Sequence, residues 1–226
     1  MALVRATNPD SAGQILYGTN TLGLSTNATT ALFVDDRQRV GIGTRTPSGT
    51  LDVANRGITT GSMPAGSVIQ VVNTYYTTPT SQSVTGGAIN NITGLEAIIT
   101  PTATSSRILI FVRWFGEHGT YSANWEGMFG ITRNGTAIGL PPQQGTNIIG
   151  ITSSVLSHNA ADQDSTPESV SYHYLDSPGT TSALTYRAYF IPQTTETLFT
   201  NRCVNPTTTA SYERGTSSIM LMEIAG

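Results

Sequence analysis

Residues 171–190 read SYHYLDSPGTTSALTYRAYF, and residues 216–226 read TSSIMLMEIAG. Both stretches are rich in aromatic and other apolar side chains, and no 3.6-residue apolar period runs through them, which favours strands over helices. In each stretch apolar side chains occupy both alternating sets of positions. A strand of this kind is usually covered by protein on both faces. We therefore expect the last strand of the sequence to be core rather than tail.

Residues 107–115 have the same double apolar character. One alternating set holds Ile108, Ile110, Val112 and Trp114, and the other holds Leu109, Phe111 and Phe115. One face of such a strand can fill a sandwich interior, whereas the other would be exposed in a monomer and marks an interface. We therefore expect symmetric self-association. The candidate subunit-interface residues are Gly41, Gly43, Arg113, Met220, Met222 and Glu223.

Arg113 and Glu223 interrupt the apolar runs of their strands. One interpretation pairs them across a subunit boundary, where they fix register more than they add affinity. The other leaves them as two solvated charges at the sheet edge.

Short strand-like runs separated by Gly, Pro, Asn and Ser indicate an all-β protein with almost no helix. From residue 67 onward these runs recur at the spacing typical of sandwiches. The expected strands cover residues 67–76, 92–100, 107–115, 127–133, 136–140, 147–156, 169–175, 181–191, 196–204 and 216–224. Asn134-Gly135 lies between two of these runs and predicts a type I′ hairpin turn.

Residues 1–61 contain few aromatic side chains and are expected to form an extended arm with a small hairpin over residues 31–43. So few large apolar groups do not support independent folding without a partner chain. Residues 57–66 (GITTGSMPAG) are the expected linker. We accordingly expect two parts, an arm at 1–61 for attachment and self-association, and a head domain at 62–226.

Several phrases resemble those of one protein family. YLDSPGTTSALTY at 174–186, SIMLMEIAG at 218–226 and ITPTATSSRILIFV at 99–112 resemble the C-terminal domains of fibre and virion-surface proteins of tailed bacteriophages, notably cyanophages. RVGIGTRTPSGTLDV at 39–53 resembles a phrase that recurs in phage fibres and other trimeric surface proteins. The resemblance implies an antiparallel jelly-roll head of the C1q/TNF-like type, assembled as a trimer.

Composition narrows the function further. A net charge of −3 provides no basic footprint, so no nucleic-acid partner is expected. No apolar run approaches the ~20 residues of a membrane helix, and the first residues do not read as a secretory signal. The single cysteine, Cys203, is expected to be buried and excludes an internal disulfide framework. We expect synthesis in the host cytoplasm and a final location on the virion surface.

No catalytic set emerges from the sequence, so no enzyme activity and no cofactor are expected. His118, His158 and His173 are far apart, and no nucleophile elbow accompanies Glu117-His118. The acidic loop at 162–168 has spacing that weakly suggests calcium, but it lacks the full ligand set. Whether it binds an ion stays open.

Residues 114–129 (WFGEHGTYSANWEGMF) combine aromatic, amide and carboxylate side chains around glycines. An exposed aromatic ring beside such groups suits a sugar, whereas packing in a core or interface explains the same residues. The candidate glycan contacts are Trp114, Tyr121, Asn124 and Trp125.

Two roles fit this set of features. The first is a capsid decoration or cement protein, which attaches to a major capsid protein through residues 1–61. The second is a short tail fibre or receptor-binding tip, which attaches to a tail or baseplate protein and recognises host surface polysaccharide. The modest length of the arm favours the first, and the resemblance to fibre tips favours the second.

Overall fold

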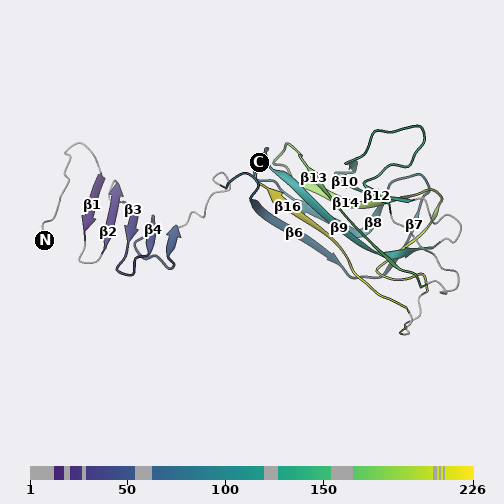
Figure 1. Ribbon diagram of the computed structural model, residues 1–226, viewed down its shortest axis with the longest axis horizontal. Helices are drawn as coiled ribbons and strands as arrows, with labels where there is room; N and C mark the ends of the chain where they lie inside the picture. Colours follow the sequence, from purple (N-terminus) through teal and green to yellow (C-terminus); the bar gives the residue numbers. More distant parts are fainter. Residues whose placement is uncertain are drawn as a thin grey trace. The chain divides into compact units, whose positions relative to one another are not determined.

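The computed structural model describes residues 13–17, 21–26, 29–53, 63–119, 127–153, 165–205, 208, 210 and 212–226. The chain divides into two compact units, Met1–Met63 and Pro64–Gly226 (Figure 1). The described residues form β-strands and no helix, which confirms the all-β prediction. None of these residues belongs to a helix with the length and hydropathy that a membrane crossing requires.

The N-terminal unit is a single five-stranded sheet in the order β1-β2-β3-β4-β5. Its strands are β1 (Gly13–Tyr17), β2 (Leu22–Thr26), β3 (Thr29–Val34), β4 (Val40–Ile42) and β5 (Leu51–Val53). Neighbours are antiparallel except β4 and β5, which run parallel. The predicted hairpin over residues 31–43 is confirmed as the β3–β4 pair. Residues 13–17 and 22–26, expected as part of an extended arm, instead form two further strands of the same sheet.

The second unit, which we call the head, is a sandwich of two antiparallel sheets. The first sheet has the order β6-β16-β9-β13, and β15 with β7 extends it beyond the end of β16. The second has the order β8-β14-β10-β11, and β12 also pairs with β10. The strands of the first sheet are β6 (Val68–Tyr76), β7 (Thr80–Val84), β9 (Arg107–His118), β13 (Glu168–Asp176), β15 (Glu196–Thr200) and β16 (Ser217–Ile224). Those of the second are β8 (Asn90–Ile99), β10 (Gly127–Arg133), β11 (Thr136–Ile138), β12 (Thr152–Ser153) and β14 (Leu184–Pro192).

The connectivity of the head is that of a jelly roll. With β7, β12 and β15 set aside, the remaining strands in chain order pair first-eighth-third-sixth in one sheet. In the other sheet they pair second-seventh-fourth-fifth. Eight antiparallel strands in two sheets with such crossovers make a jelly roll. The predicted jelly-roll sandwich is therefore confirmed.

The space between the sheets is filled by aromatic and β-branched side chains. Trp114 of β9 is fully buried and packs against Phe129 of β10, with ring centroids 5.2 Å apart. Phe190 of β14 lies 4.8 Å beyond Phe129. The indole Nε1 of Trp114 donates a hydrogen bond to Thr200 Oγ1 at 3.0 Å, so the buried ring keeps its polar atom satisfied.

The β10–β11 hairpin confirms the predicted turn. Arg133 pairs with Thr136 across it, and Asn134 and Gly135 have φ of 49° and 86°. Positive φ at both central residues is the requirement of a type I′ turn. Asn134 Oδ1 also accepts a hydrogen bond from the Thr185 amide at 2.8 Å, which ties the turn to β14.

Replacing Gly135 with alanine is expected to destabilise the head by roughly 1–2 kcal/mol, because a Cβ is strained at positive φ. A Cβ there would meet no atom within 4 Å, so the cost is conformational rather than steric. Thermal unfolding measures it. Thr136→Ala in the same hairpin is the control, and equal melting temperatures for the two variants would contradict the assignment.

Candidate functional site: an exposed apolar sheet face

The first sheet of the head presents an apolar face away from the sandwich interior. Its most apolar row is formed by Val71, Met222, Leu109 and Leu175, which lie opposite one another on β6, β16, β9 and β13. We call the whole surface the outer face. It consists of Val71, Asn73, Tyr75, Leu109, Phe111, Arg113, Ser171, His173, Leu175, Ser218, Met220 and Met222.

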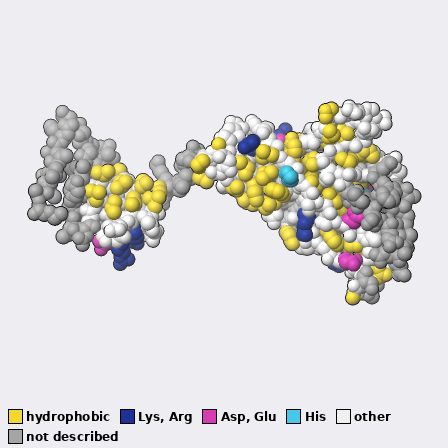
Figure 2. Space-filling view, viewed as in Figure 1, with side chains coloured by type: hydrophobic (Ala, Val, Ile, Leu, Met, Phe, Trp, Pro, Cys, Tyr) yellow, Lys and Arg dark blue, Asp and Glu magenta, His cyan; other side chains and the backbone are white. Residues whose placement is uncertain are grey.

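The outer face is exposed within this chain. Val71 is 52% accessible, Tyr75 60%, Leu175 40% and Phe111 38%. Figure 2 shows hydrophobic side chains gathered over β6 and β16. Contiguous apolar surface that crosses four strands is unusual on an isolated soluble domain and marks an interaction site.

One end of the outer face is hollowed and polar. A cavity of about 360 Å³ lies over the rows of Met220 and Ser218 and is lined in part by Asn73, Tyr75 and His173. The His173 ring lies 5.8 Å from the ring of Phe111. Because this end carries both rings and polar groups, it can accept a protruding side chain from a partner.

Arg113 closes the polar end of the outer face. Its Nη2 donates to Thr216 Oγ1 at 2.7 Å, and that hydroxyl donates to Tyr75 Oη at 3.0 Å. The guanidinium is thus held at the rim of the apolar surface. Rim charges of this kind govern register and encounter rate more than affinity.

Three of the predicted interface residues, Arg113, Met220 and Met222, lie on the outer face. The sequence missed the contributions of β6 and β13, namely Val71, Asn73, Tyr75, His173 and Leu175. The alternation of Val71, Asn73 and Tyr75 along one strand was the available signal. Without the pairing of β6 with β16, nothing in the sequence connected that alternation to Met220 and Met222.

Glu223 requires a correction, because it lies on the inner face of β16 and is fully buried. Its Oε1 accepts hydrogen bonds from the Thr102 amide, the Thr102 hydroxyl and the Ser106 hydroxyl at 2.7, 2.7 and 2.6 Å. Its Oε2 accepts from Gln70 Nε2 at 2.6 Å. A carboxylate engaged in this way within its own subunit is not available to Arg113 of another subunit. Glu223 instead fastens the loop after β8 to the first sheet.

Burial raises the pKa of the Glu223 carboxyl, but the hydrogen bonds from Ser106, Gln70 and Thr102 outweigh burial and hold that pKa below its usual value near 4.5. The folded head therefore favours the ionised form. A carboxyl with a depressed folded-state pKa stabilises the fold above its unfolded pKa, and this contribution is lost as pH falls through the folded pKa.

The two glycines predicted at a threefold axis lie in the other unit. Gly41 is buried in β4, and a Cβ there would lie 2.4 Å from the carbonyl oxygen of Thr44. Gly43 is exposed and has φ of 73°. Contacts and backbone conformation within one chain therefore account for both glycines.

The predicted glycan contacts divide differently. Trp114 is core, since its side chain is fully buried between the sheets, and it is not accessible to a sugar. Tyr121, Asn124 and Trp125 lie outside the described residues. So do Asp162 and Asp164 of the acidic loop, whereas Glu168 begins β13.

Glu117 and His118, adjacent on β9, are both buried but point into different surroundings. Glu117 accepts from the Thr166 amide and hydroxyl through one oxygen and from the Val204 amide through the other. His118 Nδ1 lies 3.0 Å from Glu196 Oε1. Both side chains are thus engaged in fixing loops and strands to one another. No group of three or more His, Cys, Asp or Glu side chains within the described part of the chain is placed to hold a metal ion.

Comparison with known proteins adds little to this description. No family model matches the chain, and no curated protein matches it. Among solved structures, the chain is similar to that titled "Crystal structure of infectious bursal disease virus VP2 subviral particle", with a TM-score of 0.30 and 11% identity. The match covers 94% of this chain and 49% of that one, so the chain spans about half the length of the viral protein. The resemblance to phage fibre and virion-surface proteins stays a prediction from the sequence phrases.

Replacing Glu223 with glutamine is expected to destabilise the head at neutral pH by about 1–3 kcal/mol. The NH₂ group of the new side chain would lie beside groups that now donate hydrogen bonds to the carboxylate, and a buried donor would lose its acceptor. The difference in stability from the unsubstituted protein should shrink as pH falls below about 4.5. In that range Glu223 of the unsubstituted protein takes up a proton on unfolding, and the folded head loses the advantage of the ionised carboxylate. Urea unfolding at neutral and acidic pH measures both effects. Glu96→Gln is the control, because that carboxylate pairs with Arg187 at the surface. A pH-independent difference would contradict an ionised, buried Glu223.

Proposed function

We propose that this chain is a non-enzymatic structural protein of a bacteriophage particle. In this proposal three copies associate through the outer face, and the head is displayed on the virion surface as a capsid decoration protein. Residues 1–61 attach the trimer to the major capsid protein. The observation that carries the proposal is the exposed apolar surface across β6, β16, β9 and β13.

The outer face supports self-association for a physical reason. β9 and β16 are apolar on both sides, but the second sheet of the same head buries only one side of each strand. The other side is left for a partner. A specific interface usually buries about 800 Å² per partner, and obligate ones bury more and are more apolar. A surface that is aliphatic at one end, with Arg113 and Tyr75 at the other, combines the apolar contact area and the polar border found in such interfaces.

The phage assignment rests on the sequence phrases and agrees with the jelly-roll connectivity of the head. The phrase at 99–112 covers the loop that Glu223 fastens and the first half of β9, and the phrase at 218–226 covers β16. Both therefore lie in the strands that form the outer face. If those surface proteins also associate through this face, the shared requirement explains why these two segments of the chain resemble theirs.

Val71→Asp is expected to weaken self-association by roughly 30-fold or more, because burying an unpaired carboxylate at an interface costs at least about 2 kcal/mol. Ile98→Asp is the matched control, since Ile98 is β-branched, lies on an edge strand of the other sheet and is 56% exposed. Sedimentation velocity over a concentration series reads out the assembly. A full-length protein that sediments as a monomer throughout would overturn the proposal, as would equal behaviour of the two variants.

The position on the particle is tested separately. Gold-labelled antibodies against the head should decorate the capsid shell of purified virions. Labelling confined to the tail would replace the decoration role with the tail-fibre role and would leave the trimer untouched. Absence of the protein from purified virions would refute both.

A further inference from the structure

Eight aliphatic side chains of the N-terminal sheet lie together on one face of β2, β3, β4 and β5. In one cross-strand row Leu24, Leu32, Ile42 and Val53 lie opposite one another on β2, β3, β4 and β5. In the next row Leu22, Val34, Val40 and Leu51 do the same. Residues paired in register share a face of the sheet. We call these eight side chains the aliphatic face.

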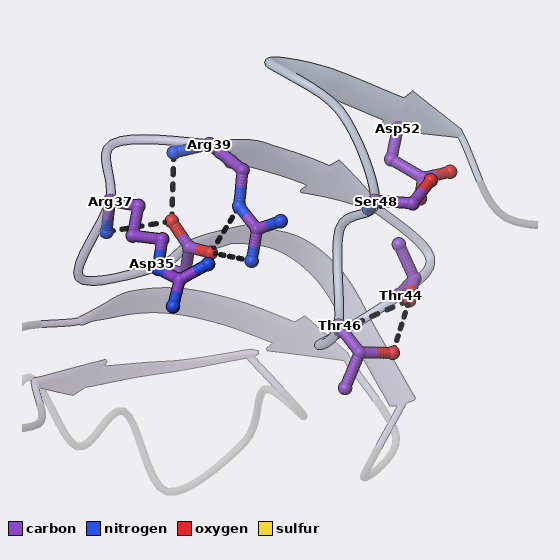
Figure 3. A network of polar contacts seen from close by, with 7 residues as sticks. All are labelled: Asp35, Arg37, Arg39, Thr44, Thr46, Ser48 and Asp52. Atoms are coloured by element: carbon purple, nitrogen blue, oxygen red, sulfur yellow. Dashed lines mark hydrogen bonds and ion pairs between the residues drawn. The ribbon is translucent and has the colours of Figure 1, made fainter.

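The opposite face of the same sheet has a different character. Its central row is Gly23, Phe33, Gly41 and Asp52. Asp52 accepts hydrogen bonds from the amide and hydroxyl of Ser48 at 2.7 and 2.8 Å (Figure 3). The two rows of the aliphatic face are therefore hydrocarbon, whereas the central row of the opposite face is partly polar.

Asp35 and Arg39 of this unit are engaged with each other in the turn between β3 and β4. In the β3–β4 turn, Asp35 Oδ1 accepts from the amides of Arg37 and Arg39 at 3.0 and 2.8 Å, and Oδ2 accepts from Arg39 Nε at 2.7 Å (Figure 3). The strand positions that form the aliphatic face hold no charge in any of the four strands. Two such faces can meet without repulsion between like charges.

The aliphatic face has no covering layer within the described part of its own unit. Leu51 is 63% exposed, Ile42 43% and Leu24 40%, and the other five side chains are half-buried. All of the buried hydrophobic core residues of the described chain lie in the head, from Val84 onward. The apolar face of a sheet is normally buried against another layer. Something must cover this face in the working protein.

We propose that the aliphatic face packs against the same face of other copies of this chain, as an assembly site separate from the outer face of the head. A second copy fits because the eight aliphatic side chains carry no charge, so like faces can pack together without burying an unpaired charge. The inference rests on the proposed self-association of the head. Once heads associate, the linked N-terminal units stay at an effective concentration of roughly millimolar, which favours like units over outside partners. Attachment to the particle then uses other surfaces of residues 1–61.

The test measures whether the aliphatic face is covered, using cysteines introduced on β5 of the full-length chain. Leu51→Cys places a thiol on the aliphatic face, and Asp52→Cys places one on the opposite face of the same strand. The native Cys203 is fully buried and provides the unreactive background. In the assembled protein, a maleimide should modify Leu51→Cys roughly 10-fold more slowly than Asp52→Cys, as expected for a site that reacts only on opening.

A second background identifies the occupant. With Val71→Asp added, at a concentration where sedimentation shows a monomer, the protection of Leu51→Cys should disappear. Protection that persists in this monomer would mean that the chain covers its own face, and the proposal would be wrong. Rapid modification of Leu51→Cys in a protein that still sediments as an oligomer would also refute it, while leaving the proposed function intact. Without any oligomer, both proposals fail together.

Discussion

Strand alternation imposes one constraint on which the rest of the head depends. β9 and β16 lie side by side in the first sheet, and each strand has large apolar side chains on both of its sides. A two-sheet sandwich can cover only one side of a sheet. The covered side holds Ile110 and Leu221, and the other side presents Leu109 and Met222 to the exterior. The jelly roll thus buries the inner face of the first sheet and leaves the outer face exposed.

The two units meet this constraint to different degrees. The head has a core of its own, built around Trp114 and Phe129, so its folding does not depend on the outer face. The eight side chains of the aliphatic face are at most half-buried, so a second layer over that face would stabilise the N-terminal sheet. Buried polar contacts such as those of Glu223 then fix how loops attach to the sheets, which apolar packing alone does not specify.

Local signals predicted a large part of the fold, and long-range pairing explains what they missed. Alternation over residues 107–115 predicted two apolar faces, and Asn134-Gly135 predicted its hairpin. β7 (Thr80–Val84) is polar in sequence and is a strand because β15 pairs with it. The expected strand over 147–156 is described as far as residue 153, and within that part only Thr152 and Ser153 pair with a neighbour. Glu223 was misplaced because its hydrogen-bond donors come from a loop about 120 positions away. No feature of the strand itself indicates those donors.

The pairing of β6 with β16 has a consequence for how the protein is made. Among the described strands, β6 pairs only with β16. Gln70 and Glu223 form a hydrogen bond across that pair and are 153 positions apart in the sequence. At about 5–20 residues per second, a ribosome exposes β6 for many seconds before its partner exists. Closure of the first sheet therefore waits until β16 has been synthesised, and non-local β topologies of this kind generally fold slowly. During that interval the nascent chain carries an open, apolar strand edge that is prone to misassociation, so chaperone protection is most valuable between the synthesis of these two strands.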